Sequence, residues 1–387
     1  MQKILLFIAS LFYFNSLFAK NEIKSWQGIH ETPLSRLEQQ FADPPVEFAN
    51  HVIWGWEGKM DKKTICNDLD SIKKKGFRAV IFEAGYKLPF KYLSEEWFKA
   101  IRTGVLEAKK RGMKVWIIDE GKYPSGFAGG KFSQERPDLR MQALVIGDTI
   151  QVKRGEVMTN HKIAPEIISA VAVSTSGAPN RTVAINNGEI SFNAGLDDWK
   201  ILLVKSDFRT AVTRAVNNPN GGKDATNSLC DYLNPVAVQQ FIDWTHEQYK
   251  KYLGKELGTT VLGFRGDEPD YAHLPWTPSI VQTFKDTKGY DPTPYLASFF
   301  TTSPTIQEQR VKADYWDVWS SLFATHFFKL QADWCAANGV AHITHLNKEH
   351  EMPACVKAEG DYFRNLSKVQ IPGVDAVSYT HLRAHET

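Results

Sequence analysis

The alternation of strand and helix patterns between residues 51 and 118 decides the fold class. Three short runs of β-branched and aromatic residues read HVIWGW at 51–56, AVIF at 79–82 and KVWII at 114–118. Apolar residues at helical spacing lie between these runs, over Met60–Lys75 and Ser94–Arg111. Buried strands that alternate with amphipathic helices predict an α/β fold, in which a parallel sheet is covered by helices.

The same alternation resumes after residue 234. Asn234 and Pro235 are a helix N-cap and a first helical residue, and they open a helix that we expect to reach Leu253. A second helix is predicted from about Ile306 to Ala337, and further strands at 260–264 (TVLGF), 341–344 (AHIT) and 373–376 (GVDA). Six strands in βα units favour a (β/α)8 TIM-type barrel that is incomplete. The competing doubly wound sheet usually carries a Gly-rich phosphate turn, and GFAGGK at 126–131 has neither of the expected Gly spacings.

An inserted antiparallel β-domain interrupts the barrel pattern between residues 144 and 216. Segments of alternating polarity, such as ALVIGDTIQV and ISAVAVS, are separated there by Gly, Asn and Asp. The predicted organisation is a signal peptide (1–19), an N-terminal extension (20–50), a first barrel part (51–143), the insertion (144–216), a second barrel part (217–376) and a non-native tail (377–387).

The composition excludes some partner classes. Lys plus Arg number 46 and Asp plus Glu number 44, so the net charge of +2 offers no electrostatic reason for nucleic-acid binding. Apolar residues make up 43% and charged residues 23%, as in ordinary globular proteins. Aromatic residues reach 12%; many belong in a core, and Trp and Tyr also suit a cleft for sugars, because ring faces stack on C–H surfaces.

The N-terminus has the pattern of a secretory signal peptide. Lys3 is followed by the apolar run 4–18 and by Ala19, a small residue suited to cleavage. We therefore expect a periplasmic or secreted protein with no integral membrane segment after cleavage; a buried N-terminal helix is the alternative.

The C-terminal eleven residues, VSYTHLRAHET at 377–387, resemble the translated read-through of a sequencing adapter. We expect them to be non-native and the chain to be a fragment of a longer parent. Strands seven and eight of the barrel would then be missing. Such a fragment would expose sheet edges, aggregate readily and lack the parent's activity.

The spacing of the cysteines and histidines does not indicate a metal site. The four cysteines, at 66, 230, 335 and 355, show neither a CxxC pair nor metal-ligand spacing. We expect Cys66 and Cys335 to be buried free thiols, and a Cys230–Cys355 bridge stays open.

His342 and His345 (HITH) lie three residues apart on a strand, so they should point to opposite faces and cannot hold one ion. The first strand has no HxH motif and the sequence has no EF-hand loop, so the metal ligands, if any, are unknown.

Polar and aromatic residues follow each of the first five strands. Those from which we expect substrate contacts are Trp54, Trp56, Glu83, Asp119, Glu120, Tyr123, Arg265, Asp267, Tyr271, His345 and Asn347. In a barrel, the carboxyl ends of the strands surround one pocket. Several carboxylates and aromatics at such a pocket, without a phosphate loop, are typical of glycoside hydrolysis.

The best general acid is Glu268 in GFRGDEPDY, because it leaves a buried strand directly and has Arg265 and Asp267 beside it to tune its pKa. The plainer interpretation is a surface glutamate in a turn. For the second carboxylate we select Glu359 in AEGDYFR, with Glu349, Glu351, Asp119 and Glu120 as competitors.

Residues 54–376 resemble the catalytic part of glycoside hydrolase family 106, the α-L-rhamnosidase-like proteins. The segments that carry the resemblance are IWGWEGKMDKKTICNDLDSIKKKGF (53–77), KVWIIDEGKYPSGFAGG (114–130), LGFRGDEPDY (262–271), KGYDPTPYL (288–296) and EGDYFRNLSKVQIPGVD (359–375). The resemblance implies a (β/α)8 barrel with an inserted β-domain and an exported enzyme that cleaves glycosides by inversion with calcium assistance. It also implies that Glu268 stands where the general acid is expected.

Two other function classes stay open at this point: a non-catalytic carbohydrate-binding barrel, and a metal-dependent hydrolase of another class. A separation of about 5–5.5 Å between the two carboxyl groups would mean retention, and about 6.5–9.5 Å inversion. The sequence leaves the sugar, the linkage and the oligomeric state open.

Overall fold

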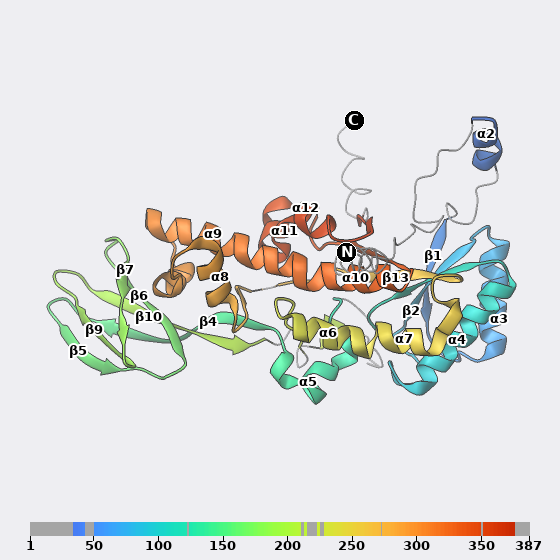
Figure 1. Cartoon of the computed structure of the whole chain (residues 1–387). Coiled ribbons are helices and arrows are strands. Elements are labelled where there is room, and N and C mark those ends of the chain that lie inside the picture. The colour runs from blue at the N-terminus through green and yellow to red at the C-terminus, as the bar shows by residue number, and fades with distance from the viewer. Residues whose placement is uncertain are drawn as a thin grey trace, which may run out of the picture.

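A parallel sheet forms one end of the molecule and antiparallel β-structure the other (Figure 1). The structure is a computed structural model that describes residues 34–42, 50–121, 124–209, 213–214, 223–224, 228–271, 273–349 and 351–375. The predicted signal peptide, Tyr123 and the predicted non-native tail lie outside the described residues.

Six parallel strands make up the larger sheet. They are β1 (His51–Trp56), β2 (Ala79–Ala84), β3 (Lys114–Ile118), β13 (Val261–Asp267), β15 (Ala341–His345) and β16 (Ile371–Pro372), in that order across the sheet. Neighbouring strands pair in parallel, and their order in the sheet follows their order in the chain. The predicted α/β fold with a parallel sheet is therefore confirmed, and closure into a barrel stays a prediction.

Strand β13 fits closely between its neighbours. A Cβ atom added at Gly263 would lie 1.9 Å from the carbonyl oxygen of Ala341 and 2.6 Å from the ring of Trp116, so only glycine is accommodated. The last strand differs from the prediction, because β16 pairs at Ile371–Pro372 and not at 373–376.

Four helices cover the same face of this sheet: α3 (Lys62–Lys74), α4 (Glu95–Lys110), α7 (His246–Leu253) and α10 (Lys329–Ala337). Their apolar side chains share one core cluster with strand residues such as Phe82, Ile117 and Phe264. A separate, smaller cluster on the opposite face contains Ile81, Trp116, Ile118, Leu262 and Ala341. A doubly wound sheet would carry helices on both faces, so this arrangement agrees with the rejection of that fold.

The predicted helix starts are confirmed by their caps. The side chains of Asp61, Ser94 and Asn234 accept hydrogen bonds from backbone N–H groups in the first turns of α3, α4 and α6 (Pro235–Trp244). The helix expected from residue 235 to 253 is broken at Thr245, which separates α6 from α7. The hydroxyl of Thr245 donates to the carbonyl of Phe241 at 2.7 Å, and such back-bonding favours a bend.

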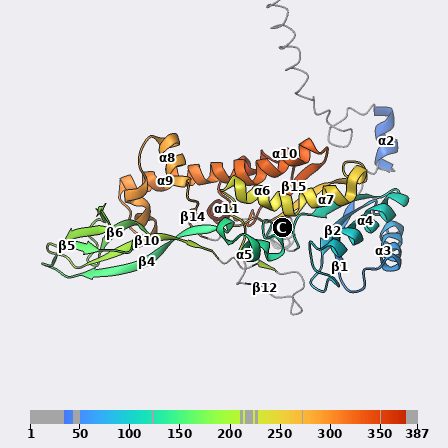
Figure 2. The ribbon, with the colours of Figure 1, turned by 60° about the horizontal axis from the view of Figure 1, so that its bottom comes forward.

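One long helical run spans both halves of the molecule (Figures 1 and 2). It consists of α9 (Ile306–Leu322), a π-helical turn at Phe323–Phe328 and α10, so the predicted helix from 306 to 337 is confirmed with a local irregularity. A capping box between Thr305 and Glu308 fixes its start.

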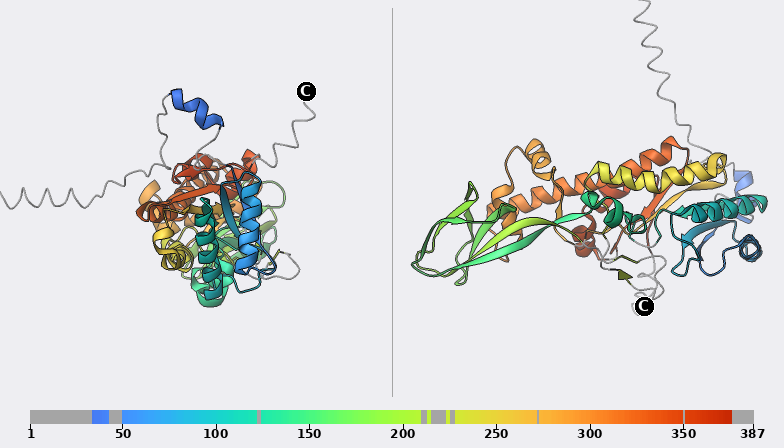
Figure 3. Two further views of the ribbon diagram at one scale, coloured as in Figure 1. Left: turned by 90° about the vertical axis from the view of Figure 1, so that its right-hand side faces the viewer. Right: turned by 90° about the horizontal axis from the view of Figure 1, so that it is seen from below.

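The antiparallel part contains a five-stranded and a three-stranded sheet. The first is ordered β14 (Pro275–Trp276), β4 (Gln142–Val152), β10 (Trp199–Phe208), β6 (Ile167–Ser174) and β7 (Arg181–Val183), and the second β5 (Val157–Lys162), β9 (Glu189–Asn193) and β8 (Ile185–Asn186). A further pair joins β11 (Thr213–Arg214) to β12 (Lys223–Asp224). Figure 3 shows the two main antiparallel sheets projecting away from the parallel sheet.

The remaining helices are α2 (Leu34–Ala42), α5 (Lys131–Glu135), α8 (Ile280–Lys288), α11 (Met352–Glu359) and α12 (Tyr362–Leu366). None of the helices in the described ranges combines the length and the apolar character that a bilayer span requires. All four cysteines are free thiols, so the Cys230–Cys355 bridge that the sequence left open is not formed. Cys335 is buried as expected, whereas Cys66 is half-buried.

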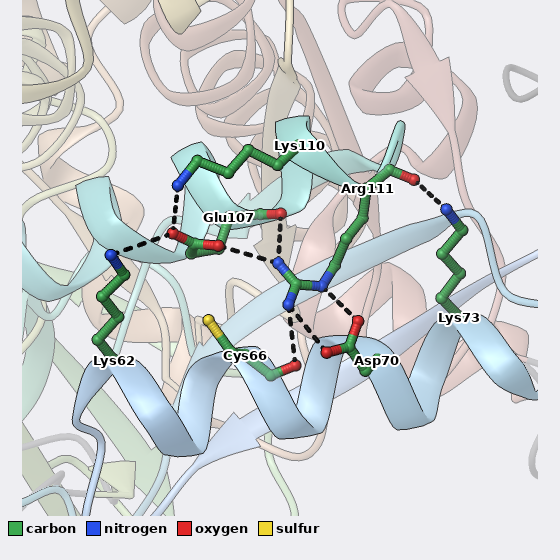
Figure 4. Close-up of polar contacts among 7 residues, drawn as sticks. All are labelled: Lys62, Cys66, Asp70, Lys73, Glu107, Lys110 and Arg111. Atoms are coloured by element: carbon green, nitrogen blue, oxygen red, sulfur yellow. Dashed lines mark hydrogen bonds and ion pairs between the residues drawn. The ribbon is translucent and has the colours of Figure 1, made fainter.

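A network of charged side chains joins α3 to α4 (Figure 4). Glu107 on α4 is 6% exposed and accepts hydrogen bonds from Lys110 at 2.7 Å and from Arg111 at 3.0 Å. Arg111 also donates to both carboxylate oxygens of Asp70 on α3, at 2.7 and 2.9 Å. The hydrogen bonds from Lys110 and Arg111 lower the pKa of Glu107 to about 2.

We expect Glu107→Gln to lower the free energy of unfolding by about 1–2 kcal/mol at pH 7, because it removes the negative charge between the two cations. A depressed folded-state pKa stabilises above the unfolded-state pKa, so the deficit should shrink as the pH falls from about 5 towards 2. Urea unfolding of the unmodified protein and of Glu107→Gln between about pH 5 and pH 2 measures this difference in the free energy of unfolding. Glu95→Gln is the control on the same helix, since Glu95 pairs only with Lys99 at the surface. A deficit that persists at pH 2 would contradict the assignment.

Candidate active site at the carboxyl ends of the parallel strands

The carboxyl ends of β2, β13 and β15 bring three of the predicted residues, Glu83, Asp267 and His345, to one face of the sheet. Glu83 and His345 follow Ile81 and Ile343 by two positions, and both isoleucines pack on the face that the helices do not cover. The register pairs Asp267 with His345, which places these two directly side by side. Charge from Glu83 contributes to raising the pKa of Asp267, so Glu83 belongs to the same group.

His345 is at the centre of this group. Arg265 Nη2 lies 3.4 Å from His345 Nδ1, and a guanidinium has only donors, so Nδ1 acts as the acceptor and the ring proton resides on Nε2. That nitrogen lies 3.3 Å from Asp267 Oδ1 and 3.6 Å from Glu268 Oε1. In its neutral form the imidazole thus points its N–H at both carboxylates.

The two carboxylates control the charge of this imidazole. Burial alone would lower the pKa of His345, but its hydrogen bond to Glu268 and the charge of Asp267 outweigh burial and raise it. Burial raises the pKa of Asp267, against the opposing charges of Arg265 and His345. Both pKa shifts arise from burial and from charges within the group, and perturbed pKa values of this kind are common at functional sites.

Glu268 itself leaves the strand in a strained conformation. Its φ is +42°, in the left-handed region that non-glycine residues rarely adopt. Its side chain is 23% exposed, so it can reach a ligand from solvent. Strain of this kind is maintained where the surrounding structure enforces it, and it turns the carboxylate towards His345.

Asn347 connects the turn after Glu268 to Glu359. Its side chain donates to Asp270 Oδ2 at 3.1 Å, and its backbone N–H donates to Glu359 Oε1 at 2.9 Å. The backbone N–H of Tyr271 also donates to the carbonyl of Ala358 at 3.0 Å. The structure thereby brings the two predicted catalytic carboxylates to the same region.

Glu359 is fully buried, and its Oε2 has no hydrogen-bond partner among the described residues. Burial raises its pKa well above the ordinary value, and the charges of Asp270, Glu268 and Glu349 raise it further. Burial also raises the pKa of Asp270. Burial therefore disfavours the ionised form of Glu359 in this conformation.

A calcium ion is the cofactor that the family resemblance implies. Ligand atoms of Glu268, His345 and Asp375 lie within 4.8 Å of one another. Two carboxylates suit calcium, but an imidazole nitrogen does not, because calcium takes oxygen ligands. This three-residue set therefore does not fit calcium.

Trp54 and Trp56 are placed elsewhere. They point to the helix-covered face, where Trp56 is fully buried and its ring lies 5.0 Å from Phe82 and 5.7 Å from Trp97. Trp54 packs against the same core cluster. The period of two along β1 assigns both rings to the core, and the sequence interpretation overlooked this.

Asp119 and Glu120 are also internal. Asp119 is fully buried, and its Oδ1 accepts from Ser125 Oγ at 2.7 Å. The Glu120 carboxylate accepts from the backbone N–H groups of Gly121 at 2.7 Å and Gly129 at 3.0 Å, and from that of Ala128. Burial raises the pKa of Glu120 to about 7 despite these bonds. Both side chains organise the GFAGGK loop from within.

Tyr271 is 2% exposed, and its ring packs edge-on against Tyr232 and Phe323 in the central core. Tyr123 lies outside the described residues. The sequence reasoning did not select Asp270 or Asp375, although both belong to the site by the contacts above. Asp375 follows β16 in the same way as the other acids follow their strands, so the same rule would have found it.

Comparison with known proteins agrees with this geometry. The sequence profile of the alpha-L-rhamnosidase family of glycoside hydrolases matches residues 181–375, half of the chain. The chain belongs to this family. The matched segment begins in β7 and includes β13, β15, β16 and every residue of the group around His345 except Glu83.

Two similar proteins are longer than this chain. A protein of Formosa agariphila named "Putative beta-glucuronidase" is 23% identical over 394 residues, which cover 88% of this chain and 32% of that protein. The solved rhamnosidase from Novosphingobium sp. PP1Y has 15% identity and a TM-score of 0.62, over 88% of this chain and 49% of its own. The second likeness supports the fold, and the chain spans about a third and about half of the two relatives.

We expect the ring of His345 to titrate above the ordinary histidine pKa of 6.5, because the neighbouring carboxylates favour the imidazolium. A raised folded-state pKa stabilises below the unfolded-state value, and this contribution is lost as the pH rises through the folded-state value. Long-range ¹H–¹⁵N NMR of the imidazoles measures the midpoint, with the signal assigned by its loss in His345→Gln.

Asp267→Asn should lower this midpoint, since it removes one of the two charges. His342 is the internal reference, because burial lowers its pKa to about 4 and it should stay neutral over the same range. A midpoint of His345 below 6.5 in the unmodified protein would contradict the geometry.

Proposed function

We propose that this chain is the catalytic part of an exported glycoside hydrolase that cleaves glycosidic bonds of complex polysaccharides by a two-carboxylate general acid/base mechanism. Membership of the alpha-L-rhamnosidase family supports the reaction class. The observation that carries the proposal is the placement of Glu268 at the end of β13, solvent-accessible and facing the Nε2 proton of His345. Export is proposed from the N-terminal sequence pattern alone.

Glu268 acts as the general acid in this proposal. Glycoside cleavage needs a proton delivered to the leaving oxygen as the bond breaks. Once Glu268 has given up its proton, its partly exposed carboxylate takes another from solvent, and the Nε2–H of His345, 3.6 Å away, holds that carboxylate in place. Asp267 Oδ1, 3.3 Å from the same nitrogen, orients the imidazole.

Glu359 is the proposed second carboxylate. It is bonded to Asn347, which also binds the turn that follows Glu268. As a base it must be ionised and must reach the water that attacks the sugar. Because Glu359 is fully buried here and burial disfavours its charged form, substrate binding has to open this region before Glu359 can act.

The complete site is proposed to require more than the described sheet. We propose that the six parallel strands belong to a (β/α)8 barrel whose closure would surround the sugar. The sugar is proposed to be a rhamnoside or a glucuronide, from the names of the family and of the Formosa relative.

Glu268→Gln should reduce kcat on an alkyl glycoside of the matching sugar by about 10²–10⁴-fold, because glutamine cannot donate the proton. The assay uses a panel that contains α-L-rhamnosides and β-glucuronides. Glu95→Gln is the control, as an exposed glutamate on α4 that forms a surface ion pair with Lys99, and it should leave kcat unchanged.

Leaving groups separate the two roles. Dinitrophenolate leaves a dinitrophenyl glycoside without being protonated. On that substrate Glu268→Gln should therefore have most of the kcat of the unmodified protein, whereas Glu359→Gln should not. The opposite pattern would exchange the roles of the two residues. Full activity of Glu268→Gln on the alkyl glycoside would remove it from the mechanism.

A further inference from the structure

We propose that His246, Cys335 and His342 form a second, buried site that binds a zinc ion and ties the helix layer to the parallel sheet. His246 begins α7, Cys335 lies on α10 and His342 lies on β15. This site is separate from the group around His345, because His342 and His345 point to opposite faces of β15, as the sequence predicted.

The three side chains converge on one point. One ligand atom from each lies within 4.8 Å of the other two. In a tetrahedral site, two atoms bonded to one zinc ion at about 2.0–2.3 Å are about 3.3–3.8 Å apart, so the side chains must close by up to about 1.5 Å to complete the site. Their exposures are 0%, 0% and 1%, so water does not compete for the ligand atoms.

Hydrogen bonding fixes the tautomer of His246. The hydroxyl of Thr245 donates its proton to the carbonyl of Phe241 at 2.7 Å. The same hydroxyl oxygen lies 2.9 Å from His246 Nδ1, so it accepts from an Nδ1–H group. His246 Nε2 is therefore the nitrogen with the lone pair, and it has no hydrogen-bond partner among the described residues. Orientation of a ligating histidine through its other nitrogen is the usual arrangement in metal sites.

His342, like His246, has at least one buried ring nitrogen that lacks a hydrogen-bond partner among the described residues. Neither of its ring nitrogens has a hydrogen-bond partner among the described residues, although the residue is 1% exposed. An unsatisfied buried polar atom is destabilising, and a metal bond would satisfy one of them. Burial lowers the pKa of His342 to about 4 and that of His246 well below its ordinary value, so both rings are neutral, as metal ligation requires.

The carboxylate of Asp119 lies near this cluster and could supply the second negative charge needed to balance a divalent cation. Asp119 is fully buried, and its Oδ2 has no hydrogen-bond partner among the described residues. A Cβ atom added at Gly266 would lie 3.3 Å from His342 Nε2 and 3.4 Å from Asp119 Oδ2, so the glycine leaves these two polar atoms facing a common space. The thiolate of Cys335 and the carboxylate of Asp119 would together balance a divalent cation.

The donor set selects the metal. Two imidazoles and a thiolate are borderline-soft ligands that suit zinc, whereas calcium and magnesium take oxygen ligands. Burial raises the pKa of the Cys335 thiol when no metal is bound, so zinc binding should displace its proton and depend on pH. Such a site would hold α7, α10 and β15 together and so stabilise the sheet.

Metal loading of the full chain tests the proposal. The protein is incubated with zinc sulfate, freed of unbound metal by gel filtration and analysed for zinc per chain. We expect about one zinc ion per chain, and close to none in Cys335→Ala and His342→Ala. Cys355→Ala is the matched control, because Cys355 is also a buried free thiol but lies on α11 outside the cluster, and it should keep its zinc.

Cobalt gives a readout of the ligands themselves. Co²⁺ added to the unmodified chain should produce the d–d bands of a four-coordinate site and a thiolate-to-cobalt charge-transfer band. The second band should vanish in Cys335→Ala and persist in Cys355→Ala. Circular dichroism confirms that each variant is folded. An unmodified chain that emerges without zinc, or a Cys335→Ala variant that retains zinc and the charge-transfer band, would overturn the proposal.

Discussion

The pairing of β13 with β3 on one side and β15 on the other is the contact on which the site depends. It joins segments that are separated by about 140 residues of intervening chain on one side and about 75 on the other. Parallel pairing places all three carboxyl ends at one edge, and the register sets Asp267 beside His345. Without this register, Arg265 would not reach His345, and the proton of that imidazole would have no defined position.

The two-residue period of the strands separates two kinds of polar group. On β15, His345 faces the side chains that solvent can reach, whereas His342 faces the helices and is enclosed with His246 and Cys335. The same alternation sends Trp54 and Trp56 into the core beneath α4. On β15, one face therefore contributes to the candidate active site and the other face packs against the helices.

The strand–helix alternation, the helix caps and the parallel sheet could be predicted from the sequence, because apolar spacing and capping residues act locally. The break at Thr245 and the short β16 could not, since they depend on a back-bonded hydroxyl and on pairing with β15. At the site, the rule that acids follow strands located Glu268 and Glu83. It failed for Asp119, because the rule ignores which face a residue points to and that carboxylate is buried on the helix side.

The long run of α9, the π-helical turn and α10 has a mechanical consequence. The turn at Phe323–Phe328 is packed into the central core through Phe323, Phe327 and Phe328, so the run is clamped at its middle. One end reaches the antiparallel sheets and the other packs against the parallel sheet. The run therefore couples the two ends of the molecule, because a displacement of the antiparallel sheets has to move a helix that is packed at its middle and against β15.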